Sequence, residues 1–196
     1  MARYEIRIAG YGGQGVITLS KMITMACAIH ENLATTQTEA YSAAARGGSC
    51  WAEVVVDLDK EVKIIDYPKA LEPYDILIIL SQESANRIRS NVLKKEKNTG
   101  YLIWDTSTIQ EFKAANEIPN AFRMPIQKIS LETFGNTVYG NSIIFGIFSV
   151  LSGIFSEKSA TKTIKEFVPS YTLDTNMKAF EIGRKAGQDF LNKLHA

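Results

Sequence analysis

YEIRIAGYGGQGVITLSKMI, residues 4–23, contains three patterns in series. Residues 4–9 are strand-like, residues 10–15 match the glycine pattern G-x-G-x-x-G, and apolar residues then recur at helical spacing from Val16. Glycines let the chain turn sharply and bring backbone N–H groups close to a ligand, and the following helix points its positive end at the same place. The segment therefore predicts a loop that binds a phosphate or pyrophosphate group. The candidate binding residues in this loop are Gly10, Gly12, Gly13, Gln14 and Gly15.

Two features that often accompany such a loop are missing. A Walker A loop continues with Lys and then Ser or Thr, but Gly15 is followed by Val16 and Ile17, which argues against NTP hydrolysis. A dinucleotide site has an acid about 20 residues further on, at the end of the second strand. The expected second strand, residues 33–37, holds no acid, and Glu39 falls in the loop expected after it. Two alternatives remain. The chain could be a free-standing NAD(P)-binding oxidoreductase domain, or the glycine turn could bind no ligand and only let the helix pack closely on the sheet.

The segment 39–49, EAYSAAARGGS, supplies a second candidate. In a doubly wound fold the loop after strand two lies near the strand-one glycine loop, so Arg46 is a candidate for a bidentate phosphate contact, with Gly47 and Gly48 beside it. The alternative for a lone arginine is a solvated ion pair. RNA-binding Arg-Gly-Gly segments are repeated and disordered, whereas this one is single and is followed by a predicted strand, so nucleic acid is not expected.

The glycine loop belongs to a longer series of motifs. The others are Tyr41 followed by residues 45–49, ARGGS; residues 52–54, AEV; Asn141; and Asn176-x-x-Ala179-x-x-x-Gly183. In this order and spacing they resemble the gamma subunit, or gamma domain, of the 2-oxoacid:ferredoxin (or flavodoxin) oxidoreductases, over most of the chain. Residues 65–69, IDYPK, and 80–83, LSQE, most resemble the gamma chain of the 2-oxoglutarate enzyme rather than that of the pyruvate enzyme.

The resemblance implies a division of labour among several chains. Such enzymes oxidatively decarboxylate a 2-oxoacid on thiamine diphosphate, pass electrons through iron–sulfur clusters to ferredoxin or flavodoxin, and release an acyl-coenzyme A. It implies that thiamine diphosphate belongs to alpha and beta subunits, that the iron–sulfur clusters lie on partner subunits, and that a delta subunit belongs to the same complex. This chain is then expected to be inactive alone and to contribute coenzyme A binding and assembly. The phosphates of coenzyme A are suited to the glycine loop and Arg46.

Cysteine and histidine usage agrees with a chain that carries no redox or metal centre of its own. Cys27 and Cys50 are far apart without a C-x-x-C pair, so they cannot supply the thiolates of a cluster, and small buried hydrophobes are the expected roles. His30 and His195 lack metal-ligand spacing. No catalytic residue and no metal ligand is therefore assigned.

Composition limits the class of protein. With 196 residues, 45% hydrophobic and 22% charged, the chain is expected to form one domain, residues 1–196. A net charge of +1 argues against electrostatic capture of nucleic acid or an anionic membrane. The first residues enter a charged strand without a signal-peptide core, so a cytoplasmic location is expected.

The rest of the chain alternates strand and helix patterns. Strands are predicted at residues 49–57, 62–66, 75–80, 101–104 and 121–126, the first two as a hairpin and the last at an edge because Pro125 cannot donate to a ladder. A helix is predicted over residues 81–95. The expected fold is α/β, a single-domain Rossmann-like mixed, mostly parallel sheet flanked by helices.

Residues 141–155 form the most apolar segment, yet they are too few for a bilayer, which takes about 20 residues. Small residues recur along one face of this predicted helix, at Ser142, Gly146, Ser149 and Gly153. The helix over residues 176–191 repeats the pattern with Ala179, Gly183, Ala186 and Phe190. The first helix is expected either inside the protein against the sheet or at a subunit interface, and the two helices are expected to pack on each other or on a partner.

Overall fold

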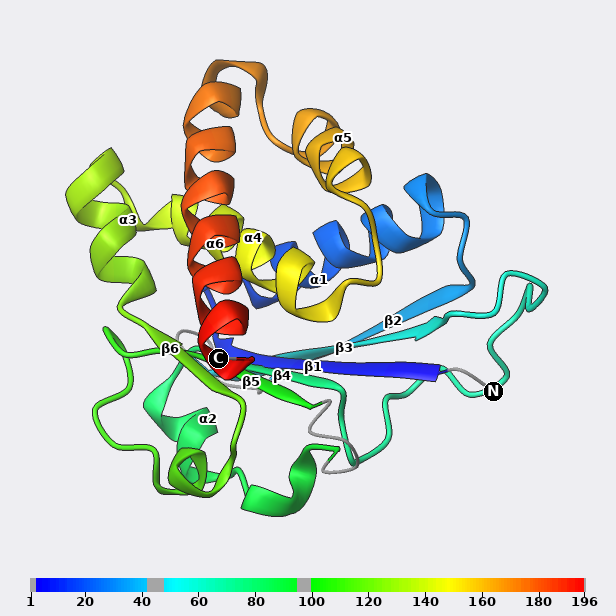
Figure 1. The fold of residues 1–196 in the computed structure, drawn as a ribbon, viewed down its shortest axis with the longest axis horizontal. Coiled ribbons are helices and arrows are strands. Elements are labelled where there is room, and N and C mark those ends of the chain that lie inside the picture. Colours follow the sequence, from blue (N-terminus) through cyan, green and yellow to red (C-terminus); the bar gives the residue numbers. More distant parts are fainter. Residues whose placement is uncertain (1–2, 42–47, 95–99, 196) are drawn as a thin grey trace.

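The computed structural model describes residues 3–41, 48–94 and 100–195, and its centre is a six-stranded sheet in the order β2-β3-β1-β4-β5-β6 (Figure 1). The strands are β1 (Arg3–Tyr11), β2 (Thr35–Tyr41), β3 (Ser49–Asp57), β4 (Ile76–Ile79), β5 (Tyr101–Asp105) and β6 (Ala121–Met124). The α-helices are α1 (Val16–Met25), α2 (Gln82–Asn86), α3 (Ile126–Phe134), α4 (Gly140–Ser152), α5 (Glu157–Phe167) and α6 (Leu173–Leu194). Shorter helical turns are η1 (Ala26–His30), η2 (Ser90–Val92), η4 (Lys113–Glu117), η5 (Thr137–Tyr139) and η6 (Ser170–Thr172).

One strand reverses the direction of an otherwise parallel sheet. β1, β4, β5 and β6 pair in parallel, whereas β3 pairs antiparallel with β1 on one side and with β2 on the other. The predicted mixed, mostly parallel α/β fold is confirmed, and β6 lies at the edge as expected, ending just before Pro125. The second strand, predicted at residues 33–37, extends to Tyr41, so Glu39 lies within β2 and not in a loop.

The predicted hairpin between residues 49–57 and 62–66 is wrong. Residues 62–66 form no strand, because both edges of β3 are already paired, with β1 and with β2. The hairpin partner of β3 is β2, which precedes it in the chain. Alternating polarity alone cannot form a strand where no sheet edge is available to receive its hydrogen bonds.

The helix predicted over residues 81–95 is also too long. α2 ends at Asn86, and the chain then turns so that Leu93 forms a parallel bridge with Tyr74. The Tyr74 N–H donates to the Val92 carbonyl at 2.7 Å, and the Lys94 N–H donates to the Tyr74 carbonyl at 2.9 Å. Lys94 Nζ also contacts the Asp75 carboxylate at 2.6 Å. These long-range contacts outweigh the helical propensity of the segment.

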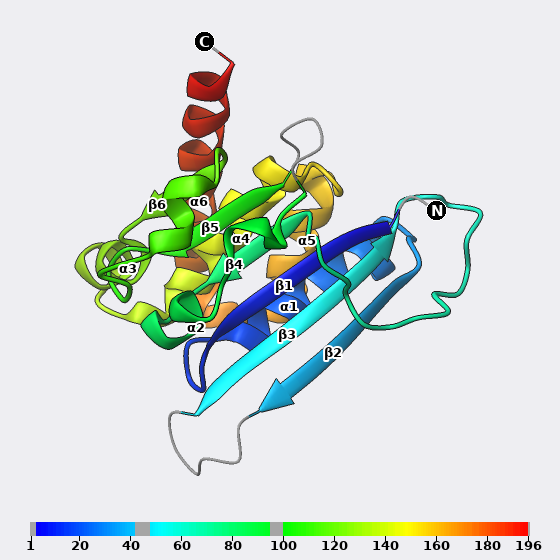
Figure 2. The same ribbon diagram turned by 90° about the horizontal axis from the view of Figure 1, so that it is seen from below.

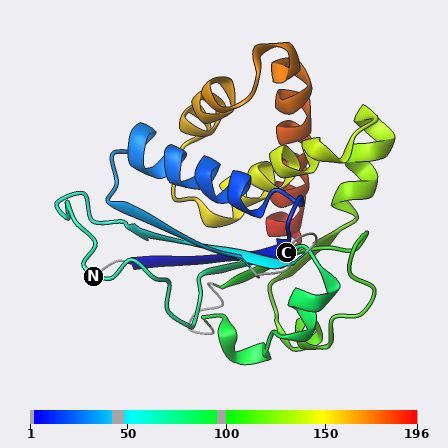
Figure 3. The same ribbon diagram turned by 180° about the vertical axis from the view of Figure 1, so that it is seen from behind.

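Two apolar layers cover the sheet unequally. α1, α4, α5 and α6 lie over one face, as Figures 1 and 3 show, and pack there on residues such as Ile6, Ile8 and Val54. The opposite face carries α2 and η4 over β4 and β5, around Leu77 and Leu102. Figure 2, seen from below, leaves β1, β3 and β2 in open view on that face. Of the described helices, none is both long and apolar enough to cross a bilayer.

α4 and α6 pack backbone to backbone through the predicted small residues. A Cβ added to Gly183 of α6 would overlap the Ile143 carbonyl oxygen, and one added to Gly146 of α4 would overlap the Phe180 carbonyl oxygen. Phe145, on α4, contacts the Phe180 ring, with centroids 5.9 Å apart. The expected close packing is therefore confirmed, and the neighbour of each helix is the other helix of the same chain.

Candidate functional site

The glycine loop leaves the carboxyl end of β1 and opens α1. Gly13 has φ 94° and Gly15, the residue that caps α1, has φ 76°, a region that side-chain-bearing residues rarely occupy. No side chain caps the first turn of α1, and that turn holds no acid. Within the first turn of α1, no side chain therefore caps the backbone donors and no acid neutralises the positive end of the helix dipole.

Gly48, the residue before β3, contacts this loop. The Gly12 N–H donates to the Gly48 carbonyl at 3.1 Å, so Gly48 lies directly beside the glycine loop. Arg46 and Gly47 lie outside the residues that the structure describes. Their contact with a phosphate group stays a prediction from the sequence, although Gly48 shows that the segment ends at the expected place.

The Gln14 side chain supports the glycine loop through two hydrogen bonds to the backbone. Its Oε1 accepts the Tyr11 N–H at 2.7 Å, and its Nε2 donates to the Leu80 carbonyl at 2.6 Å, at the end of β4. A Cβ at Gly10 would lie only 2.7 Å from Gln14 Oε1, so Gly10 makes room for this amide. The geometry therefore gives Gln14 and Gly10 a supporting position under the loop.

We expect Gln14→Leu to lower the free energy of unfolding by about 1–3 kcal/mol, because it removes two hydrogen bonds worth about 0.5–1.5 kcal/mol each. The matched control is Gln110→Leu, since Gln110 is exposed and bonds only through its backbone N–H. Urea unfolding of both variants measures the difference. Equal stabilities would show that the Gln14 amide does not hold the loop.

Asn141, the second residue of α4, contacts the loop from the other side. A Cβ at Gly15 would overlap the Asn141 Nδ2, so the amide rests directly on the Gly15 backbone. Among the described residues the Asn141 side chain has no hydrogen-bond partner. Its donor and acceptor are therefore available to a ligand at the loop.

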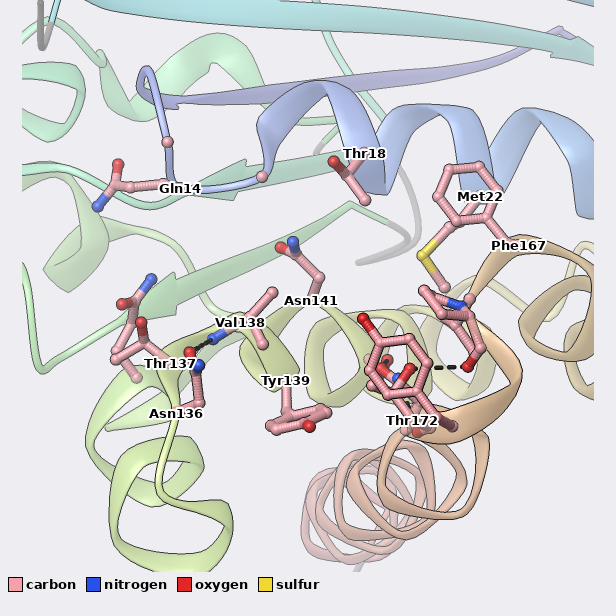
Figure 4. Close-up of a pocket in the computed structure, with 18 residues that line it drawn as sticks. Gln14, Thr18, Met22, Asn136, Thr137, Val138, Tyr139, Asn141, Phe167 and Thr172 are labelled. Carbon is pink, nitrogen blue, oxygen red and sulfur yellow. Dashed lines mark hydrogen bonds between the residues drawn. The ribbon is translucent and has the colours of Figure 1, made fainter.

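A cavity of about 730 Å³ opens between the glycine loop and the amino-terminal ends of α3, α4 and α6. Figure 4 shows Gln14, Thr18 and Met22 on one side of it, residues 136–139 on the opposite side, and Asn141 pointing from α4 toward the loop. Its volume lies within the range of about 300–1,000 Å³ that is usual for small-molecule sites. The lining residues are Gly13, Gln14, Gly15, Thr18, Met22, Gln127, Asn136, Thr137, Val138, Tyr139, Asn141, Ser142, Phe167, Val168, Pro169, Tyr171, Thr172 and Asn176.

The glycine motif locates one wall of this cavity, and two residues of the family motifs, Asn141 and Asn176, lie in its other walls. Gly13, Gln14 and Gly15 line it, whereas Gly10 lies beneath the loop and Gly12 faces Gly48. Apart from Asn141 and Asn176, the residues of the walls 136–142 and 167–176 belong to no motif named above, and tertiary packing brings them to the cavity. The local signal available for them is the Asn136 cap, whose Oδ1 accepts the Val138 N–H at 3.0 Å and marks the turn into α4.

Neither cysteine has the environment of a reactive or metal-binding thiol. Burial, with a smaller effect of the Glu31 carboxylate, raises the pKa of the Cys27 thiol well above its usual value. Burial also raises the pKa of Cys50 in β3. Within the described part of the chain no group of three or more His, Cys, Asp or Glu side chains is arranged to hold a metal ion.

The strand order also bears on the dinucleotide alternative. In a dinucleotide fold the acid that binds ribose ends the strand next to β1. Here β3 occupies that place, so Glu39 in β2 is two strands, about 10 Å, from β1. Glu39 pairs level with Ala52, which is level with Ile8 in the middle of β1. Its carboxylate also accepts from Gln37 at 2.9 Å and from Tyr41 at 3.1 Å, so it cannot serve as that acid.

Comparison with known proteins gives one consistent result. The sequence profile of the pyruvate ferredoxin/flavodoxin oxidoreductase family matches residues 5–186. The 2-oxoglutarate synthase subunit KorC of Methanothermobacter thermautotrophicus is 37% identical over 188 residues, which cover 93% of this chain and 94% of that protein.

Solved structures share the fold. The gamma subunit of a keto/oxoacid ferredoxin oxidoreductase from Geobacter sulfurreducens superposes with a TM-score of 0.76 at 24% identity, covering 95% of this chain and 99% of that one. A 2-oxoglutarate:ferredoxin oxidoreductase from Magnetococcus marinus, solved with 2-oxoglutarate, coenzyme A and succinyl-CoA bound, gives 0.75 at 21% identity. The match covers 96% of this chain but 32% of that one.

Proposed function

We propose, from the premise that this chain belongs to the pyruvate ferredoxin/flavodoxin oxidoreductase family, that it binds coenzyme A and completes the assembly of a 2-oxoglutarate:ferredoxin oxidoreductase. The chain is the gamma subunit of a 2-oxoacid:ferredoxin oxidoreductase, and among such enzymes it is most like the 2-oxoglutarate enzyme. The complex oxidatively decarboxylates the 2-oxoacid to an acyl-coenzyme A.

The observation that carries the proposal is the uncapped amino-terminal end of α1 beneath a loop with two left-handed glycines. A phosphate group placed there accepts backbone N–H donors and meets the positive end of the helix. Asn141 adds a side-chain amide beside Gly15. Gly48, two residues after Arg46 in the chain, contacts Gly12 and so supports a position for Arg46 near the loop. Coenzyme A carries a pyrophosphate and a 3′-phosphate, which suits such a site.

The proposal assigns the remaining chemistry to partner subunits. Both cysteines are buried thiols, and this chain presents no thiolate set for a cluster among its described residues. We place thiamine diphosphate and the iron–sulfur clusters on alpha and beta subunits, with a delta subunit in the same complex, and we take ferredoxin or flavodoxin as the electron acceptor. In the Magnetococcus marinus protein a matching unit is about a third of a longer chain, which supports close association with other units. We further propose that the complex is cytoplasmic and that residues 1–196 form one gamma domain. In this proposal the chain contributes no catalytic residue.

We expect Arg46→Ala in the assembled complex to raise the Michaelis constant for coenzyme A by about 10- to 100-fold. The change removes a charge-assisted hydrogen bond worth about 1.5–3 kcal/mol. The matched control is Arg123→Ala, an exposed arginine of β6 that does not line the cavity. Steady-state oxidation of 2-oxoglutarate at varied coenzyme A concentration measures the effect.

Decarboxylation measured without coenzyme A should persist in the Arg46 variant, because we place that chemistry on other subunits. An unchanged Michaelis constant for coenzyme A in a fully assembled complex would overturn the assignment of Arg46. The identity of the substrate is tested separately, by measuring the activity of the native complex on a series of 2-oxoacids. A clear preference for pyruvate would overturn the assignment of 2-oxoglutarate as the substrate.

A further inference from the structure

The cavity of about 730 Å³ continues from the glycine loop toward an uncharged interior. Gly13 and Gly15 form its loop end, so a phosphate held at the loop would lie at the mouth of the cavity. From there the space extends past Asn141 toward the turns that precede α4 and α6 (Figure 4). A ligand with a phosphate at one end can therefore place a second group inside.

The lining selects a neutral group for this interior. Every described lining residue is uncharged, so nothing in this part of the chain offers a cation to a carboxylate such as that of a 2-oxoacid. Several lining side chains instead carry both hydrogen-bond donors and acceptors. Those of Gln127 and Asn141 make no hydrogen bond with other described residues, and Asn136 uses only its Oδ1, in its cap.

Apolar and aromatic surface accompanies these amides. Met22 and Phe167 lie together at one end of the cavity (Figure 4), and Tyr139 and Tyr171 also line it. The Tyr139 ring is positioned by Phe134, at a centroid distance of 5.6 Å. Tyr171 is 88% exposed, although a large aromatic side chain normally buries most of its surface. Aromatic faces beside amide groups suit a flat heterocycle with a hydrogen-bonding edge.

We propose that this cavity binds the adenosine part of a nucleotide whose phosphates lie on the glycine loop, with Tyr171 stacking on the adenine ring and Gln127 hydrogen-bonding its edge. The identity of the ligand as coenzyme A rests on the proposed function. The neutral pantetheine arm is the competing occupant. That arm ends in the reacting thiol, which must reach thiamine diphosphate on a partner subunit, so the adenosine end is the part left to remain in this chain.

The test uses the assembled complex and competition against coenzyme A. Adenosine 3′-phosphate 5′-diphosphate, 4′-phosphopantetheine and inorganic pyrophosphate are compared as inhibitors, with the wild type and with Tyr171→Ala and Gln127→Ala. Tyr171 is so exposed that its truncation should leave the melting temperature of the chain unchanged. The matched control is Tyr67→Ala, a half-exposed tyrosine that does not line the cavity.

We expect the adenosine nucleotide to compete with coenzyme A, and Tyr171→Ala to weaken that inhibition by about 5- to 100-fold, the equivalent of one base–aromatic stack. Gln127→Ala should weaken it as well, whereas inhibition by pyrophosphate and the behaviour of Tyr67→Ala should not change. The inference would be overturned if 4′-phosphopantetheine competed with coenzyme A and the adenosine nucleotide did not. It would also be overturned if the adenosine nucleotide inhibited both lining variants as strongly as the wild type.

The outcomes separate this inference from the proposed function. In one outcome, Tyr171→Ala weakens inhibition by the adenosine nucleotide, but Arg46→Ala leaves the Michaelis constant for coenzyme A unchanged. That result would support the adenosine cavity and reject the Arg46 site. The reverse pattern would keep the phosphate site and reject the adenosine cavity. A complex in which none of the three compounds competes with coenzyme A would reject both.

Discussion

Replacing Gly183 with alanine is expected to lower the free energy of unfolding by about 3 kcal/mol or more, the upper end for overpacking a close contact. The new Cβ would overlap the Ile143 carbonyl oxygen and lie 2.8 Å from its carbonyl carbon and 3.0 Å from the Ile147 nitrogen. These are backbone atoms of α4, so no side chain can rotate away and the two helices must separate. Against a typical total of about 5–15 kcal/mol, such a loss removes a large part of the stability.

Gly187→Ala, one turn further along α6, is the matched control. Its added Cβ would lie 3.2 Å from Val150 Cβ and 3.4 Å from the Ile147 carbonyl oxygen, distances that a small shift relieves. Both substitutions gain the same helical propensity, about 1 kcal/mol. Thermal unfolding of the two variants should therefore give a large loss for Gly183 and little change for Gly187. Similar melting temperatures would show that the close approach of α4 and α6 is not a major source of stability.

Replacing Gly13 with valine is expected to raise the Michaelis constant for coenzyme A in the assembled complex by about 10- to 100-fold. A Cβ added at Gly13 has no atom of the described residues within 4 Å. The added side chain would instead occupy the space through which a phosphate approaches the backbone N–H groups. Losing one charge-assisted hydrogen bond costs about 1.5–3 kcal/mol, which gives the expected range.

Valine at position 13 also strains the backbone, since φ is 94°, and a control must carry the same strain. Gly153→Val supplies it, because Gly153 has φ 60°, has nothing within 4 Å of an added Cβ, and does not line the cavity. Both variants should lose some stability in melting experiments, but Gly153→Val should keep the wild-type dependence on coenzyme A. Equal kinetic effects would mean that strain, and not a blocked ligand, causes the change at Gly13.

The sequence predicts those parts of the fold that local chemistry determines. The apolar run 75–80 became the buried parallel strand β4, and the glycine run after residues 4–9 became the turn into α1. Residues 62–66 and 87–94 were mispredicted because their conformation depends on distant partners. The former find no free edge beside β3, and the latter are held by Tyr74 and Asp75.

The candidate site follows the same division. Its loop end, from Gly12 to Gly15, has a motif because a single short segment must turn sharply there. Its other walls come from Gln127, from the turn that Asn136 caps and from the turn into α6, and the last of these lies more than 30 residues after the other two in the sequence. The sequence marks only single residues of these walls, Asn141 and Asn176, and no local pattern predicts the cavity as a whole.

The close packing of α4 on α6 has a consequence for synthesis on the ribosome. α6 begins at Leu173, about 20 residues after α4 ends, and it supplies the surface that covers Ile143, Gly146 and Ile147. At translation rates of about 5–20 residues per second, the most apolar helix of the protein waits for seconds with that face uncovered. A nascent chain stalled before α6 emerges therefore presents a binding site for chaperones, and premature termination within α6 yields an aggregation-prone product.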